Sequence, residues 1–90
     1  MGNNNFESLC KHLVKDYYKT NYNQTVALKD IYVVWECKTL QNNKALLSTN
    51  VEDHRYFEIT YNGDRRCAYV DAYKKEKNYE EQIIDKDYGK

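Results

Sequence analysis

The sequence predicts an α+β fold: an N-terminal helix packed on an antiparallel meander of about four strands, followed by a C-terminal segment that forms either a short second helix or a tail. Apolar residues first recur at the helical period and then alternate with polar residues in several short runs. The connections between those runs are short and polar, which favours pairing between strands that are neighbours in the sequence. The chain has 90 residues, 41% of them hydrophobic. Residues 1–90 are therefore expected to form a single small domain with one core and no deep pocket.

The first predicted element is an amphipathic helix over residues 5–20. Its apolar residues recur every third or fourth position, which places them in one stripe on one side of a helix. The stripe consists of Phe6, Leu9, Cys10, Leu13, Val14 and Tyr17. Asn4 is followed three residues later by Glu7, a spacing that resembles a capping box with Asn4 as the N-cap.

The stretch from residue 30 to residue 73 predicts the meander. Its alternating runs cover residues 31–38, 45–51, 55–61 and 65–73. The dipeptide Asn62-Gly63 is the clearest hairpin signal, because both residues tolerate the positive φ of a tight turn. A two-residue turn there places Tyr56 opposite Tyr69.

Residues 74–90 remain ambiguous between a helix and a tail. Helix-forming residues are frequent in this segment, but its apolar residues Tyr79, Ile83 and Ile84 form only a thin stripe. Both alternatives stay open.

The apolar pattern of the first hairpin predicts its register. A two-residue loop would set Trp35 and Cys37 opposite polar residues, whereas a three-residue loop at residues 41–43 sets Cys37 opposite Leu47. A slip of one residue moves every side chain to the other face, so the apolar pattern should select the three-residue loop, with Asn43 in the left-handed conformation. Trp35 and Cys37 are then expected to face the helix. The residues expected on the opposite face are Tyr32, Val34, Glu36 and Lys38.

Composition narrows the functional classes. Lys+Arg and Asp+Glu both number 14, and this balance argues against a basic clamp on nucleic acid and against an acidic mimic of DNA. Tyrosine occurs ten times. Because its ring is apolar and its tip is polar, tyrosine suits partly buried sheet faces and binding surfaces. A genome rich in tyrosine codons is the alternative explanation.

The cysteines and histidines predict no catalytic or metal site. The three cysteines Cys10, Cys37 and Cys67 are widely spaced, and no apolar signal segment follows Met1, so free thiols in a reducing cytoplasm are expected. Cys10 and Cys37 are interpreted as core residues. The two histidines, at positions 12 and 54, show neither a paired acid nor the spacing of zinc ligands. We therefore expect no enzyme, cofactor, metal or membrane span.

One basic and aromatic set is a candidate for binding a partner. The candidate residues are Tyr32, Lys38, Lys44, Arg55, Tyr56, Arg65, Arg66, Tyr69, Tyr73 and Lys74. Tyrosines flanked by arginines on a sheet can dock a protein or stack on bases. The segment from 55 to 77 has six basic and four acidic residues, a small excess for a nucleic-acid footprint. A solvated sheet face is the third alternative.

The stretch from Asp30 to Lys75 and, more loosely, the helix before it resemble a family of small proteins of unknown function found in phages and prophages of Firmicutes. The residues that carry the resemblance are Val33, Val34, Trp35, Lys38, Thr39, Leu40, Gln41, Asn42, Lys44, Ala45, Leu46, Tyr61, Asn62, Gly63 and Asp64. The resemblance implies a phage accessory protein in the bacterial cytoplasm. Such a protein would bind, and inhibit, a host or defence protein; nucleic-acid binding through Tyr56, Arg65, Arg66, Tyr69 and Lys74 is the alternative.

Overall fold

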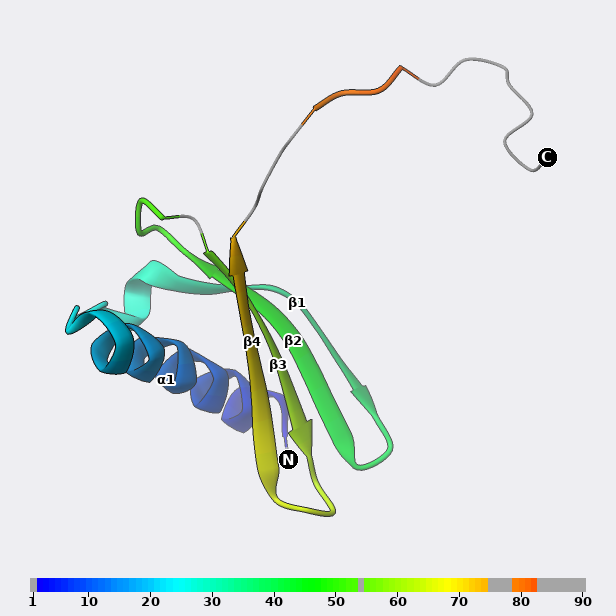
Figure 1. The fold of residues 1–90 in the computed structure, drawn as a ribbon. Coiled ribbons are helices and arrows are strands. Elements are labelled where there is room, and N and C mark those ends of the chain that lie inside the picture. Colours follow the sequence, from blue (N-terminus) through cyan, green and yellow to red (C-terminus); the bar gives the residue numbers. More distant parts are fainter. Residues whose placement is uncertain (1, 54, 75–78, 83–90) are drawn as a thin grey trace.

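The computed structural model of the protein describes residues 2–53, 55–74 and 79–82. The elements are the helix α1 (Asn3–Tyr22), the short 3₁₀ helix η1 (Leu28–Asp30) and the strands β1 (Ile31–Thr39), β2 (Asn42–Thr49), β3 (Arg55–Asn62) and β4 (Cys67–Lys74). The strands form one antiparallel sheet in the order β1-β2-β3-β4, and α1 crosses one of its faces (Figure 1). The predicted α+β fold, with an N-terminal helix on a four-stranded meander, is confirmed.

The core lies between α1 and the sheet. Phe6, Cys10, Val14 and Tyr18 recur at every fourth position of α1 and are buried, which is the spacing that places side chains on one side of a helix. They pack with buried side chains of the strands and of the loop before η1. These partners are Val26, Ile31, Ala45, Leu47, Phe57 and Ile59. The prediction that Cys10 is a core residue is therefore confirmed.

The helix is longer at both ends than predicted, and the predicted capping box is wrong. The N-cap is Gly2, without a side-chain cap hydrogen bond, and the amide of Phe6 donates to the Gly2 carbonyl over 2.9 Å. Asn4 therefore already lies inside the first turn. At the other end Asn23 adopts a left-handed conformation (φ 50°) and its amide donates to the Lys19 carbonyl, a common way to close a helix.

The predicted register of the first hairpin is wrong. Leu40 and Gln41 form a two-residue turn, so that Thr39 pairs with Asn42. Leu40, with φ 54°, takes the left-handed conformation that was expected of Asn43. The apolar pattern misled because the sheet buries Asn43, which is 1% exposed.

The shifted register also reverses the faces of β1 from Trp35 to Lys38, after the bulge at Val34, whereas Tyr32 keeps its predicted outward position. Cys37 pairs with Lys44 instead of Leu47, and Trp35 pairs with Leu46 beyond a bulge at Val34. Trp35 and Cys37 are exposed on the side away from α1, so their predicted place in the core is wrong. Glu36, expected to point outward, lies on the helix side and is half-buried, and burial together with the nearby Glu7 raises its pKa.

The second hairpin also differs from its prediction. Asn62 pairs with Cys67, so four residues (63–66) form the turn, and Tyr56 lies opposite Tyr73 instead of Tyr69. The Asn62 side chain stabilises this longer turn, because its Oδ1 accepts hydrogen bonds from the amide of Asp64 at 3.1 Å and from the amide of Arg65 at 3.2 Å.

Position 63 requires glycine because the backbone of the neighbouring turn comes close to it. A positive φ is not the reason, since the φ of Gly63 is not positive. Its amide donates to the Gln41 carbonyl over 3.1 Å, which brings the two hairpin turns together.

The question of helix or tail for residues 74–90 lies mainly outside the described residues. Lys74 is the last residue of β4, and residues 79–82 form neither helix nor strand. In the described part of the chain, no helix combines the length and the apolarity that a membrane crossing requires.

Candidate binding surface

The two faces of the sheet have different surroundings. One face packs on α1, whereas no helix or strand among the described residues covers the other (Figure 1). We call this uncovered side the open sheet face. By strand register it consists mainly of Tyr32, Trp35, Cys37, Lys44, Leu46, Tyr56, Glu58, Thr60, Tyr69, Asp71 and Tyr73.

Aromatic side chains from three strands dominate the open sheet face. Tyr32, Trp35, Tyr69 and Tyr73 are between 43% and 47% exposed. Tyr56 is half-buried, directly opposite Tyr73. Tyrosine and tryptophan bury much area at a low cost in side-chain entropy, and they are enriched where proteins bind one another. The open sheet face therefore presents residue types that are enriched in protein–protein interfaces.

The charges of the open sheet face nearly cancel. Lys44 Nζ lies 3.4 Å from Glu58 Oε1. Glu58 is also directly opposite the exposed carboxylate of Asp71. At the turn end of β4, Arg65 Nη1 donates to the Tyr69 hydroxyl over 3.4 Å. By strand register, the open sheet face therefore carries no excess of basic side chains.

The structure brings half of the predicted site residues together. Tyr32, Lys44, Tyr56, Tyr69 and Tyr73 all lie on the open sheet face.

The other half of the predicted set lies elsewhere. Arg65 and Arg66 belong to the turn before β4, with Arg66 in a left-handed conformation. Lys38, Arg55 and Lys74 occupy register positions on the helix side of the sheet. The predicted set is therefore divided among the open sheet face, the turn before β4 and the helix side of the sheet.

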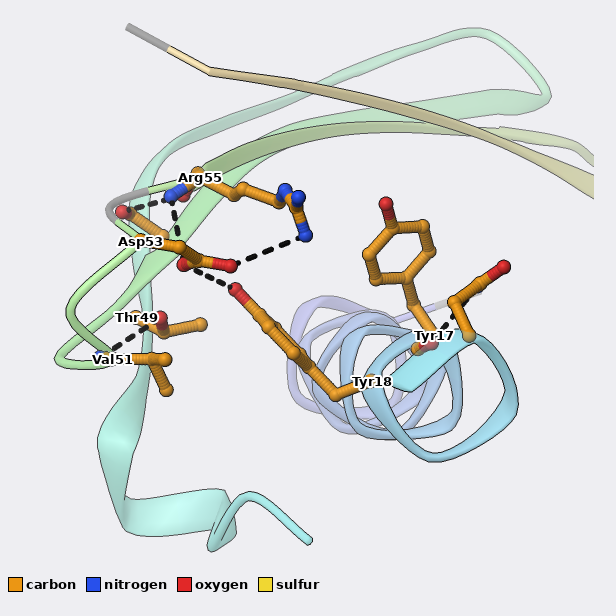
Figure 2. Close-up of polar contacts among 8 residues, drawn as sticks. Tyr17, Tyr18, Thr49, Val51, Asp53 and Arg55 are labelled. Carbon is orange, nitrogen blue, oxygen red and sulfur yellow. Dashed lines mark hydrogen bonds and ion pairs between the residues drawn. The ribbon is translucent and has the colours of Figure 1, made fainter. Parts of the chain in front are cut away.

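Arg55 belongs to a cluster that ties α1 to the loop between β2 and β3. Figure 2 shows Tyr18 reaching from the helix to Asp53, whose carboxylate also meets Arg55. The Tyr18 hydroxyl donates to Asp53 Oδ1 over 2.9 Å, and Arg55 Nη1 lies 3.2 Å from Asp53 Oδ2. The Arg55 guanidinium lies 4.6 Å from the ring centroid of Tyr22. With its side chain 13% exposed, Arg55 is engaged in holding the fold.

Sequence reasoning missed Trp35, Leu46 and Asp71 as members of the open sheet face. A signal for the first two was available in the third strand, where Phe57 and Ile59 are unambiguous core residues. In the structure, Phe57 pairs with Leu47 and Ile59 pairs with Ala45. Leu46 lies between these two partners, so its side chain is on the open sheet face, and so is that of Trp35, which pairs with it. Using this strand as the reference would have corrected the first hairpin.

Two groups with potential reactivity, Cys10 and His12, belong to α1 and lie away from the open sheet face. The thiol of Cys10 is buried, and burial raises its pKa to about 12, so it remains protonated and unreactive near neutral pH. His12 lies on α1, where its Nδ1 is 2.8 Å from the Ser8 carbonyl oxygen. The described residues contain no group of three or more His, Cys, Asp or Glu side chains placed to hold a metal ion.

Comparison with known proteins gives a family and nothing beyond it. No curated protein and no solved structure matches the chain. The model of a family of unknown function, DUF6275, matches residues 7–83. The match runs from the first turns of α1 through all four strands. The chain therefore belongs to the family of unknown function DUF6275.

Proposed function

We propose that this protein is a non-enzymatic binding module that docks on a bacterial host or defence protein through its open sheet face and inhibits it. The observation that carries the proposal is the difference in cover between the two faces of the sheet. One face packs on α1 except along the exposed end of β4, and the other presents Tyr32, Trp35, Tyr69 and Tyr73 to solvent. The resemblance of residues 30–75 to small phage and prophage proteins supports a bacterial partner and an accessory, inhibitory role.

Trp35 is the natural anchor of the interface. It pairs with Leu46 on the neighbouring strand, so a tryptophan ring and an aliphatic side chain form one apolar spot beside Tyr32. Tryptophan and tyrosine are the residues whose truncation most often costs about 2 kcal/mol or more of binding free energy. Trp35 is also the only tryptophan of the chain, so its fluorescence reports directly on this surface.

The charges favour a protein partner over nucleic acid. Lys44 is paired with Glu58, and Arg55 is paired with Asp53. These basic side chains are therefore partly neutralised, whereas nucleic-acid binders leave such groups available for phosphates.

The test compares the wild-type protein with the double variant Trp35→Ala, Tyr32→Ala. Each is immobilised and exposed to bacterial lysates in which defence systems are expressed. The wild type is expected to capture a partner in a saturable manner, and the double variant is expected not to capture it. The wild type should also reduce the activity of that purified partner in proportion to the amount added. Leu40→Ala is the matched control, because it removes an exposed apolar side chain at the turn between β1 and β2, outside the open sheet face.

The emission of Trp35 provides a second readout with the purified partner. A blue shift on mixing is expected, because docking removes the ring from water. Equal capture by the wild type and the double variant would refute the role of the open sheet face. Binding to DNA or RNA at low salt that weakens steeply as salt rises would replace this proposal with the nucleic-acid alternative.

A further inference from the structure

Among the described residues, no helix or strand covers the outer edge of β4, which is uninterrupted. All eight residues of β4 pair in continuous register with β3 on its inner side. On its outer side β4 has no neighbouring strand in the described sheet. Six of the eight residues, those from Tyr69 to Lys74, are exposed. An edge of this kind offers a row of backbone amides and carbonyls that an added strand can use.

The opposite edge of the sheet is protected. β1 is interrupted by the bulge at Val34, and α1 packs against β1 and β2. A bulge twists an edge away from a regular ladder and discourages strand addition. Of the two edges, β4 is the one that remains regular.

Three of the four helix-side residues of β4 are small and apolar, namely Ala68, Val70 and Ala72, and the fourth is Lys74 at the end of the strand. Val70 is 39% exposed and Ala72 is also exposed, so α1 does not cover this part of the sheet. An added strand would remove these side chains from water on one face while it contacts the tyrosines on the other.

The charge pattern indicates what the added strand carries. Asp71 lies directly opposite Glu58, an arrangement of like charges that destabilises a sheet. Lys44 pairs with Glu58, but among the described residues Asp71 has no ion-pair partner. Tyr69 and Tyr73 flank it on the same face, two residues away on each side. A cation placed beside Asp71 would be attracted by its carboxylate and by the faces of the two rings.

We propose that an extended segment of the partner protein adds to the sheet as a fifth strand beside β4, with an arginine or lysine opposite Asp71 and between Tyr69 and Tyr73. This inference rests on the proposed binding function and defines how the partner docks. Strand addition supplies backbone hydrogen bonds for affinity, and the acidic, aromatic site supplies specificity.

A second copy of the chain fits this edge less well. Antiparallel self-pairing centred on Asp71 would place two Asp71 carboxylates opposite each other. The charge complementarity of Asp71 therefore favours a basic segment of a different protein.

The test is a selection from a displayed library of random peptides, carried out on the intact chain. Enriched peptides are expected to carry arginine or lysine in the middle of an alternating, extended pattern. Asp71→Lys is expected to weaken these peptides about tenfold or more, because it replaces an attraction by a repulsion. The matched control is Asp16→Lys, which makes the same change of charge at an exposed position on α1.

Synthetic peptides with single N-methyl groups test the strand geometry without altering the protein. In an added strand the backbone groups of every second residue bond to the edge, so methylation should abolish binding at alternate positions only. The inference is overturned if no peptide is enriched, if Asp71→Lys binds as well as the wild type, or if methylation shows no alternation.

Two further outcomes show whether a second copy occupies the β4 edge, and whether a failure concerns only this docking mode or also the proposed function. A dimer of the free protein that Asp71→Asn strengthens, by removing the repulsion between two carboxylates, would assign the β4 edge to a second copy and overturn the fifth-strand proposal. If the peptide tests fail but the Trp35→Ala, Tyr32→Ala variant still loses its captured partner, the proposed function stands and only this docking mode is lost.

Discussion

At the scale of single residues, the hydroxyl of Tyr18 is the most consequential polar group of the core. The side chain is fully buried, and its ring lies 5.7 Å from that of Phe57 between centroids. Its hydroxyl reaches Asp53 at 2.9 Å. A buried tyrosine hydroxyl needs such a partner, because removing it from water is otherwise unfavourable.

Tyr18→Phe is therefore expected to destabilise the fold while keeping its shape. The substitution retains the ring contacts and removes one hydrogen bond to a carboxylate, which is worth about 1.5 to 3 kcal/mol. Urea unfolding followed by circular dichroism measures the change. Tyr32→Phe is the control, because that hydroxyl belongs to an exposed side chain; equal loss in both variants would contradict the role assigned to the Asp53 contact.

The stability of the protein at alkaline pH should also depend on Tyr18. Burial raises the pKa of Tyr18 from 10.0 to about 12, and Cys10 shows the same effect, from 9.0 to about 12. The unfolded chain therefore releases these protons at lower pH than the folded chain, so stability is full below pH 9 and falls between pH 9 and 12. Tyr18→Phe should flatten the part of this fall above pH 10.

At the scale of elements, the two hairpin turns support each other through Gly63. A Cβ on this residue would collide with the carbonyl oxygen of Gln41 in the neighbouring turn. Gly63→Ala is therefore expected to destabilise the protein by about 1 to 3 kcal/mol, the usual range for overpacking.

Gly2→Ala is the matched control for this prediction, because a Cβ there meets no atom within 4 Å. Thermal unfolding of both variants is the measurement. A Gly63→Ala protein as stable as the wild type would show that the β1–β2 turn can move away without cost.

The sequence was sufficient for the elements but not for their registers. The helical stripe containing Phe6, Cys10 and Val14 and the alternation around Phe57 and Ile59 depend on local periodicity, and both predictions were confirmed. The hairpin registers depend on how the whole sheet fits together. Those predictions failed.

Three residues show why. The sheet buries Asn43 and gives Leu40 a left-handed conformation, against the preference of each side chain taken alone. The side chain of Asn62 stabilises a four-residue turn in place of the expected two-residue turn. Because Trp35 changes face with the register, the most prominent member of the candidate site was assigned to the core.

At the scale of the whole molecule, zero net charge coincides with an aromatic face. Lys+Arg and Asp+Glu are equal in number, and the pI is about 6.7. Copies of the protein therefore repel one another weakly near neutral pH, where exposed aromatic rings favour association.

Solubility is expected to be lowest near the pI and to rise at higher pH. Light scattering as a function of concentration at several pH values is the measurement. The Trp35→Ala, Tyr32→Ala variant should associate less at the pI than Leu40→Ala, which removes an exposed apolar side chain outside the open sheet face. Equal association of the two variants would indicate that the open sheet face does not mediate self-association.

The strand order also has a consequence for how the chain folds. Every pair of neighbouring strands is joined by a short connection, so each hairpin closes only a small loop and can form rapidly. Docking of the helix is different, since the hydrogen bond from Tyr18 to Asp53 joins residues 35 positions apart. We expect the hairpins to form first and the attachment of α1 to set the folding rate, which makes the Tyr18–Asp53 contact the last part of the native state to appear.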